Sequence, residues 1–464
     1  MNEISGPSKQ REYYRPPAPV PRSIFWTVWR ILFSRRSDVL HYLPSGAYTA
    51  MMSPVKFARG RTMFHVNDPK VIREIMIDKV DDYPKSDVLT SSLAPLVGDS
   101  IFTVSGETWK RQHRMIDQVF QKLRLKIAFE AMQEAMREYV ARLDARIDGT
   151  VNLDEEMAFV TADVIFRTMF SRPIADEYAN IIFTEFNTYQ ETLPHTRGWD
   201  MFTRGVNDAP KVPRKGQKAC DRIREIIEVI VDERLSGKVE HDDICQIICT
   251  CTDPETGKPF TRLEMVNQIA FFFLAGHETS ASALTWTLLC LSQDDYAASR
   301  VRREVLELSN NDEIQYETIN RMKFTSAAFK EGLRLYPPVS FMPRIALKED
   351  YLRGHYDIKP DDLMVISPWT VQRHEKMWKN PDRFVPERFE NDRSGGGPNG
   401  AWIPFSVGQR VCTGAAFANA ESTLVIGTLL RRYKFTPINP DRIEPVSRLT
   451  VRPRKRIKTK VELL

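Results

Sequence analysis

A lone cysteine near the C-terminus stands in a setting that suits metal binding. Cys412 comes two residues after a fixed cation, Arg410, and shortly before a helix-forming run over residues 415–432. The N-terminus of a helix offers unpaired N–H groups and the positive end of a dipole, and both favour a thiolate. Gly408 and Gly414 let backbone amides approach the sulfur and a flat ring closely. Because no Cys or His partner stands at zinc spacing, the pattern indicates haem iron, with a buried structural cysteine as the alternative.

A carboxylate and a hydroxyl, Glu278 and Thr279, stand side by side in a long apolar segment. The segment predicts a buried helix from Thr261 to about Leu291, with Glu264 completing a capping box. Gly276 lowers helix propensity and favours a widened or kinked turn. Polar groups in an apolar helix are costly unless they are used, so the pair indicates a proton relay. The alternative is a polar pair that caps a kink.

Glu331 and Arg334 are spaced so that their side chains share one face of a helix, which ends at Pro337. On an exposed helix this spacing is common and is worth only about 0.2–0.5 kcal/mol. A further arginine, Arg388, follows in the downstream segment Pro386–Phe389.

Together these motifs resemble those of the cytochrome P-450 family. Residues Phe405–Gly414 match its haem-ligand signature, F-x-x-G-x-R-x-C-x-G, at every specified position. The resemblance extends from about Val39 to the C-terminal strands. It implies a mainly α fold with small β-sheets, in which residues 39–464 form a single haem-binding monooxygenase domain. Residues 1–38 are expected to form an N-terminal extension with a short apolar helix.

The resemblance also implies a cofactor and a reaction. Haem b is expected to be ligated by the Cys412 thiolate, and one atom of O2 to be inserted into a hydrophobic organic substrate by hydroxylation or epoxidation. Thr279 and Glu278 are expected to deliver protons, and electrons to come from NAD(P)H through separate ferredoxin- or flavodoxin-type partners. The alternatives are a peroxygenase that uses hydrogen peroxide and a haem protein that senses or binds without turnover. Retention of the acid–alcohol pair argues against both.

Further residues acquire roles by the same resemblance. Glu331, Arg334 and Arg388 are expected to form a buried network that supports the cysteine loop, where removal of one member would leave a buried charge unpaired. The remaining positions expected to contact the cofactor are Ala275, Gly276, Phe405 and Gly414.

The haem propionates need cations, and the resemblance supplies candidates. Arg344 and Arg410 are two of them. In the family a W-x-x-x-R motif serves the same purpose, but here Trp109 is followed by His113 where arginine is expected, with Arg114 beside it. We expect His113 to contact a propionate, and Arg114 is the alternative.

The substrate pocket and the partner surface are expected from the resemblance. The residues 195–215 are expected to form a mobile lid, because they mix aromatic, basic, glycine and proline residues. The pocket residues are expected to be Phe271, Phe272, Val339, Phe341 and Met342, with core packing as the alternative for each. A basic run, with a solvated face as the alternative, is expected to dock an acidic redox partner and comprises Lys110, Arg111, Arg114, Lys122, Arg124 and Lys126.

Composition excludes several other classes. The 464 residues carry 66 basic and 61 acidic side chains, and a formal charge of +5 does not suggest nucleic-acid binding. With Cys412 assigned to a metal, five of the six cysteines remain, which argues against a disulfide framework and fits a reducing cytosol.

The N-terminal region is polar and rich in proline, and no apolar run is long enough to span a membrane. We expect the apolar segment Ile24–Phe33 to pack against the body of the protein, with contact to a membrane surface as the alternative. This pattern suggests a soluble, cytoplasmic enzyme of bacterial type. Strands are expected at Ala47–Val55, Thr62–Val66, Leu363–Ser367 and Thr450–Val461.

Overall fold

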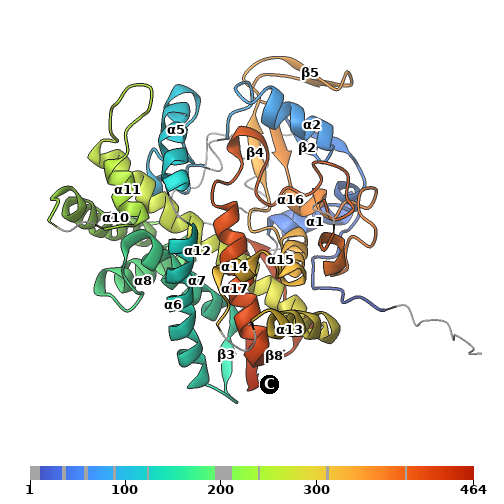
Figure 1. Ribbon diagram of the computed structural model, residues 1–464. Helices are drawn as coiled ribbons and strands as arrows, with labels where there is room; N and C mark the ends of the chain where they lie inside the picture. Colours follow the sequence, from blue (N-terminus) through green and yellow to red (C-terminus); the bar gives the residue numbers. More distant parts are fainter. Residues whose placement is uncertain are drawn as a thin grey trace, which may run out of the picture.

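The long apolar helix is present in the computed structural model as α12, Arg262–Ser292, and lies at the centre of the fold (Figure 1). The Thr261 hydroxyl accepts a hydrogen bond from the N–H of Glu264, while the Glu264 carboxylate accepts one from the N–H of Thr261 at 2.8 Å. This is the predicted capping box. The structure describes residues 11–33, 38–56, 61–86, 90–122, 125–193, 212–238, 241–309, 313–391 and 394–464.

Small residues set how closely the neighbouring helices approach α12. A Cβ at Gly276 would lie 2.3 Å from Cδ1 of Ile165 on α7 (Leu153–Phe170). A Cβ at Gly332 on α15 (Lys323–Leu335) would lie 2.0 Å from Oγ1 of Thr287. The helix continues unbroken through Gly276, so the expected widened turn is absent from α12. Close helix packing, rather than a backbone defect, accounts for that glycine.

Helices occupy most of the chain, and Figure 1 shows α5, α8, α10 and α11 on one side of α12, opposite the sheet that contains β2 and β4. The remaining helices are α1 (Ile24–Phe33), α2 (Pro69–Arg73), α4 (Ala94–Val97), α5 (Gly106–Lys122), α6 (Leu125–Asp144), α8 (Glu177–Thr192), α10 (Arg214–Leu235), α11 (Ile244–Thr250), α13 (Asp295–Ser309), α14 (Tyr316–Ile319), α16 (Pro368–Val371) and α17 (Ala415–Arg432).

The described residues form a four-stranded sheet in the order β1-β2-β7-β4, in which β2 and β7 are parallel and pair Met63 with Leu363. Smaller sheets pair β5 with β6, pair β9 with β10, and order β3-β11-β8. The strands are β1 (Met52–Lys56), β2 (Thr62–Val66), β3 (Thr150–Asn152), β4 (Met342–Ile345), β5 (Asp350–Leu352), β6 (Tyr356–Ile358), β7 (Leu363–Ile366), β8 (Tyr433–Pro437), β9 (Pro445–Ser447), β10 (Val451–Pro453) and β11 (Lys458–Leu463).

Besides the turn at Gly276, three sequence expectations need correction. Within Ala47–Val55 only the part from Met52 is a strand, because residues 45–48 form a 3-10 helix. The segment expected as one strand over Thr450–Val461 is two strands that belong to different sheets.

The third correction concerns α1, which was expected to pack against the body of the protein. Phe25 is 69% exposed and Trp29 is 49% exposed, whereas Thr27 is only 2% exposed. The helix therefore turns its small polar side chain inward and its aromatic side chains outward. No helix among the described residues has both the length and the apolar character needed to cross a bilayer.

Candidate active site

A cavity of about 370 Å³ lies between the middle of α12 and the loop that precedes α17. The cavity walls are mainly apolar. Of the residues expected at a cofactor, those that line the cavity are Trp109, His113, Ala275, Gly276, Arg344, Phe405, Arg410, Cys412 and Gly414, together with Glu278 and Thr279.

The Cys412 loop is shaped by one glycine. Gly408 has a φ of +71°, and a Cβ there would lie 2.5 Å from the carbonyl oxygen of Met76, so no other residue fits without strain. The backbone N–H of Cys412 donates to the carbonyl of Phe405 at 2.9 Å, which holds the loop closed.

The Cys412 side chain is exposed toward the cavity. Burial beneath the protein surface raises the pKa of its thiol, although a hydrogen bond from the backbone N–H of Gly414 acts in the opposite direction. The hydrogen bond at the start of α17 therefore does not by itself offset the effect of burial on the pKa of this thiol.

Three basic side chains line the cavity, namely those of Lys85, Arg344 and Arg410. Among the described residues, no carboxylate lies within ion-pair distance of any of them. Lys85 donates to the backbone carbonyl of Phe102 at 2.6 Å. The guanidinium of Arg410 lies 3.9 Å from the ring centroid of Trp109. Lys85 has no counterpart in the sequence prediction, because nothing local to it predicts that the fold brings it beside two arginines.

Burial makes these charges costly. It lowers the pKa of Arg344 to about 10 and that of Arg410 to about 10, and it lowers the pKa of Lys85 well below its usual value. Both arginines remain charged at neutral pH. A buried charge without a partner destabilises a fold, so this set fits an anionic ligand.

Trp109 and His113 face this cation set from α5. Their ring centroids are 4.6 Å apart, and Nδ1 of His113 lies 3.1 Å from a carboxylate oxygen of Asp117. Arg114 points elsewhere, because it binds Asp253 at 3.1 Å and does not line the cavity. Of the two candidates for the missing arginine, the geometry therefore favours His113.

Thr279 and Glu278 lie on α12 with different partners. The Thr279 hydroxyl lines the cavity and donates to the carbonyl of Ala275 at 2.7 Å. The Glu278 carboxylate is buried and accepts hydrogen bonds from Arg452, including one at 2.9 Å, and from Thr450 at 2.7 Å. Burial alone would raise the pKa of Glu278, but attraction to Arg452 and these hydrogen bonds outweigh it and lower the pKa. Glu278 is therefore held as an anion.

A second carboxyl group near Thr279 escaped the sequence analysis. Glu421 on α17 is fully buried, and its Oε2 accepts a hydrogen bond from the Ser280 hydroxyl at 2.6 Å, while Oε1 has no partner among the described residues. Burial raises the pKa of Glu421 to about 8, so it carries a proton at neutral pH. The sequence signal is weak, because a glutamate in a helix usually faces solvent.

The three residues expected to form a network are brought together. Arg334 donates to both oxygens of Glu331 at 2.7 and 2.8 Å, and Arg388 lies 3.3 Å from one of them. The N–H of Val385 also donates to Glu331 at 2.9 Å, and Arg334 binds the carbonyl of Gln372 at 2.7 Å. The pairs fix α15 to the segment before the cysteine loop.

Most expected substrate residues line the cavity. Phe271, Phe272, Val339 and Met342 do so, whereas Phe341 is not among the lining residues and packs against the core. Phe271 stacks on Phe102, which also lines the cavity, with ring centroids 5.6 Å apart. The expected lid lies largely outside the described residues, which omit 194–211.

The basic run on α5 is partly neutralised by the chain itself. Arg111 pairs with Glu264 at 2.6 Å, and Lys110 pairs with Glu107 at 2.9 Å. Arg114 is paired as described above, and Lys126 binds Glu317 at 2.9 Å. The side chains of Lys122 and Arg124 lie outside the described part of the structure.

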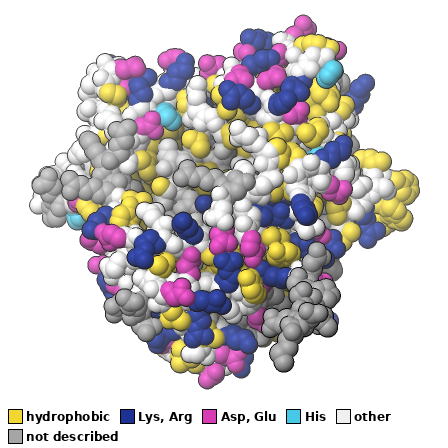
Figure 2. All heavy atoms as spheres, turned by 45° about the vertical axis from the view of Figure 1, so that its right-hand side comes forward, with side chains coloured by type: hydrophobic (Ala, Val, Ile, Leu, Met, Phe, Trp, Pro, Cys, Tyr) yellow, Lys and Arg dark blue, Asp and Glu magenta, His cyan; other side chains and the backbone are white. Residues whose placement is uncertain are grey.

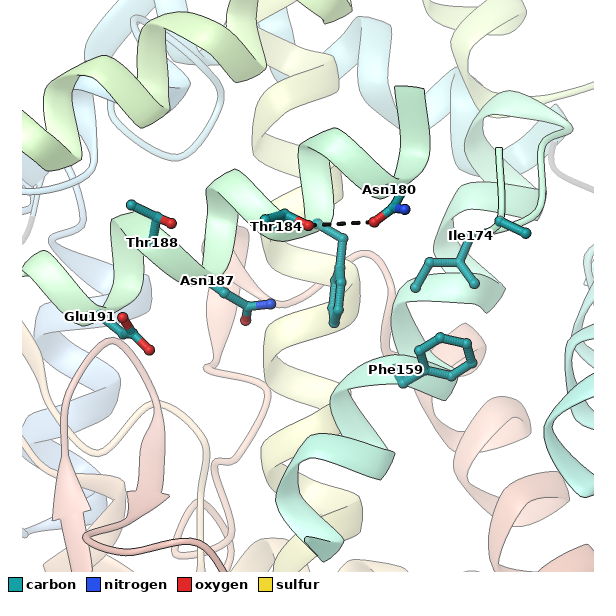
Figure 3. Close-up of a pocket in the computed structure, with 9 residues that line it drawn as sticks. Phe159, Ile174, Asn180, Thr184, Asn187, Thr188 and Glu191 are labelled. Atoms are coloured by element: carbon teal, nitrogen blue, oxygen red, sulfur yellow. Dashed lines mark hydrogen bonds between the residues drawn. The ribbon is translucent and has the colours of Figure 1, made fainter. Parts of the chain in front are cut away.

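A second hollow of about 490 Å³ lies between α8 and the residues Phe159 and Ile174 (Figure 3). Amide and hydroxyl side chains border it, and Thr184 donates to Asn180 at 3.4 Å. It contains none of the residues expected to do chemistry, so the Cys412 cavity is the better candidate for an active site.

Comparison with known proteins decides the family. The family model described as Cytochrome P450 matches residues 18–461. This chain belongs to the cytochrome P450 family. It is a haem monooxygenase and thus an oxidoreductase. The chain is 21% identical to the crystal structure of the cytochrome P450DA heme domain, with a TM-score of 0.78 over 89% of this chain and 90% of the other, which shows the fold.

Relatives of this P450 come from several kingdoms. It is 25% identical to "Cyclooctatin synthase" of Streptomyces melanosporofaciens, over 81% of each chain. It is 26% identical to "Cyclooctat-9-en-7-ol 5-monooxygenase" of the same organism, over 80% of this chain and 79% of the other. It is also 26% identical to human "Cytochrome P450 4Z1", over 84% and 80%.

The family implies a haem ligated by cysteine thiolate, and the cavity of this P450 fits one. Its acid-free cations match the two negative propionates, and the Cys412 side chain opens into the same space. The expectation of a P450 fold, mainly α with small sheets, is confirmed.

Proposed function

We propose that this P450 holds haem b through Cys412 and inserts one atom of O2 into a small to medium-sized hydrophobic organic substrate. The observation that supports this most strongly is one cavity in which a cysteine side chain, three unpaired cations and the Thr279 hydroxyl all meet. When bound, the haem supplies the oxygen chemistry: O2, two electrons and two protons yield one oxygen atom transferred to substrate and one water.

The residues of the chain bind the cofactor, line the substrate pocket and support the cysteine loop. Arg344, Arg410, Lys85 and the Trp109–His113 pair bind and orient the propionates. Phe271 and Phe272 exclude water and offer apolar surface to the substrate. The Glu331 network holds the cysteine loop in register with α12.

Proton delivery is the role proposed for Thr279 and Glu278. The Thr279 hydroxyl donates to Ala275, so its oxygen is free to accept a hydrogen bond from a water in the cavity. Glu278 is ionised, and we propose that it orders water through Thr450 and passes protons between solvent and Thr279.

Electrons are proposed to come from NAD(P)H through a separate ferredoxin- or flavodoxin-type protein. The pairing of Lys110, Arg111 and Arg114 within the chain leaves a smaller basic face than the sequence suggests, so electrostatic steering by such a partner is expected to be moderate.

An oxygen-labelling experiment tests this function. The holoprotein, a ferredoxin with its reductase and NADPH are supplied with 18O2 and a substrate selected by the change in ferric spin state. We expect one labelled oxygen atom in the product, and Thr279→Ala to consume NADPH with less product, while Thr279→Ser retains coupling. Product without label, or formation of product only with hydrogen peroxide, would contradict the proposal.

A further inference from the structure

Helix α1 carries an exposed apolar surface that nothing in the proposed function uses. Elsewhere among the described residues, exposed large apolar side chains occur singly or in pairs. Around α1 they are concentrated within fourteen residues, and Phe25, Trp26, Trp29 and Phe33 contact one another in sequence at centroid distances of 5.6–5.9 Å. The exposed members of this surface, here called the α1 surface, are Val20, Ile24, Phe25, Trp26, Val28, Trp29 and Phe33.

The α1 surface is displayed by a firmly attached segment. Arg11 binds Asp294 at 2.7 Å and also pairs with Glu387. The N–H of Phe384 donates to the carbonyl of Tyr14 at 2.9 Å. Because these contacts and the buried Thr27 fix the orientation of the helix, its aromatic side face is held toward solvent.

The sequence around α1 is basic, and one of its arginines, Arg15, is paired with Asp382 of a distant segment at 2.7 Å. Between residues 13 and 37 the sequence contains five arginines and no acidic residue. Of these arginines, Arg22 is exposed beside the α1 surface. In Figure 2 hydrophobic side chains gather at the right-hand edge of the molecule, with Lys and Arg and some acidic side chains next to them.

We propose that α1 binds the surface of an anionic lipid bilayer and lies in the plane of its headgroup region. Tryptophan and arginine together prefer this region, where the aromatic ring enters the acyl boundary and the guanidinium meets phosphate. The ten residues of α1 extend about 15 Å, half of the roughly 30 Å hydrocarbon core, so the helix lies on the bilayer without crossing it.

Charge also favours lipid over a second copy of this chain. A two-fold symmetric contact places the same patch against itself, which here would bring Arg22 of one copy toward Arg22 of the other. A bilayer rich in anionic headgroups offers the complementary charge.

The test measures binding of the full-length holoprotein to vesicles of phosphatidylglycerol and phosphatidylcholine by co-sedimentation, against vesicles of phosphatidylcholine alone. We expect at least about tenfold tighter binding to the anionic vesicles, and weaker binding at high salt. The double variant Phe25→Ser/Trp29→Ser is expected to lose about tenfold in affinity or more.

The matched control is Leu347→Ser/Tyr351→Ser, which removes two exposed apolar side chains from another part of the surface, 60% and 57% exposed, and is expected to bind as wild type. All variants are expected to retain the spectrum of the wild-type haem, which separates this test from that of the proposed function. Equal binding to both vesicle types, or wild-type binding by the α1 variant, would overturn the proposal. So would a dimer that dissociates in the α1 variant without any binding to vesicles.

Discussion

Two groups of buried charge in this molecule differ in how they are paired. In the network on α15, both oxygens of Glu331 meet Arg334, and Arg388 and a backbone N–H complete the set. In the cavity, Arg344 and Arg410 are also buried, yet neither has a carboxylate within ion-pair distance among the described residues. Buried charged side chains that pair with one another are typical of a structural network. Buried charged side chains without a partner indicate a site that is completed by a ligand.

The carboxyl groups of Glu278 and Glu421 extend the comparison. Glu278 is paired with Arg452 and stays ionised, whereas Glu421 has no cation and keeps its proton up to about pH 8. A buried carboxyl group can avoid the desolvation cost of a charge because it can be protonated at neutral pH. An arginine with a pKa of about 10 cannot do so by losing its proton, and it therefore needs an anion.

The largest effect is expected when a paired charge loses its partner. Glu331→Gln would leave Arg334 and Arg388 buried without an anion, and we expect a loss of about 3–5 kcal/mol in the free energy of unfolding, or failure to fold. Urea unfolding measures this. The control is Glu313→Gln, which breaks an exposed pair with Arg137 and is expected to cost less than about 1 kcal/mol. If the two substitutions lowered the free energy of unfolding equally, the Glu331 network would be no more important for stability than an exposed ion pair, which would contradict this account.

A pH-dependent effect is expected at Glu421. Between the ordinary pKa of 4.5 and the folded pKa of about 8, the folded protein holds a proton that the unfolded chain has released. The contribution of this group is therefore a penalty that grows as the pH rises through that window and is constant above it. Glu421→Gln is expected to gain stability relative to wild type over the same range, by up to about 5 kcal/mol.

Thermal unfolding of both proteins at a series of pH values between 4.5 and 8 measures the difference. Glu278→Gln is the contrasting variant, because it leaves Arg452 unpaired and is expected to be destabilised throughout this range. A difference between wild type and Glu421→Gln that does not vary with pH would show that Glu421 is already ionised at neutral pH.

Removal of an unpaired buried cation is expected to raise the free energy of unfolding of the apoprotein, whereas loss of a paired charge lowers it. Burial lowers the pKa of Arg344 from its ordinary value to about 10, which corresponds to on the order of 3 kcal/mol. Arg344→Met is therefore expected to stabilise the apoprotein by up to this amount and to speed haem loss from the holoprotein at least about tenfold. Arg388→Met, which removes a paired arginine, should destabilise both forms. An Arg344 variant that is less stable without haem and retains haem normally would contradict the assignment.

The smallest effect is expected at His113. Its single hydrogen bond to a propionate would be worth about 1 kcal/mol, so His113→Phe is expected to speed haem loss about fivefold. Arg114→Gln should leave that rate unchanged, because Arg114 binds Asp253 outside the cavity. The reverse order of the two variants would assign the propionate to Arg114.

Sequence patterns predicted the parts of the fold that depend on neighbouring residues, such as helix capping and the sharing of a helical face. The capping box and unbroken apolarity gave α12 to within one residue at each end, and spacing placed Glu331 and Arg334 on one helical face. The partners that set the charge states came from distant segments: Lys85 before α5, and Arg452 in β10 opposite Glu278. Their approach depends on tertiary packing, which no periodicity in the sequence encodes.

The same limit explains the correction at α1. Ten mostly apolar residues predict burial, but among the described side chains of α1 only Thr27 is buried. The hydrophobicity of a segment predicts that its side chains are removed from water. It does not predict whether they pack in the core of the protein or against another apolar surface.

The most direct test of the central claim is the absorption spectrum of the reduced holoprotein after addition of carbon monoxide. Thiolate ligation by Cys412 predicts a strongly red-shifted Soret band that is lost in Cys412→His, while Cys251→Ser, which changes a buried cysteine outside the cavity, keeps it. A wild-type band at the position typical of histidine-ligated haem, or a red-shifted band that survives in Cys412→His, would contradict the assignment of this cavity as a haem-thiolate site.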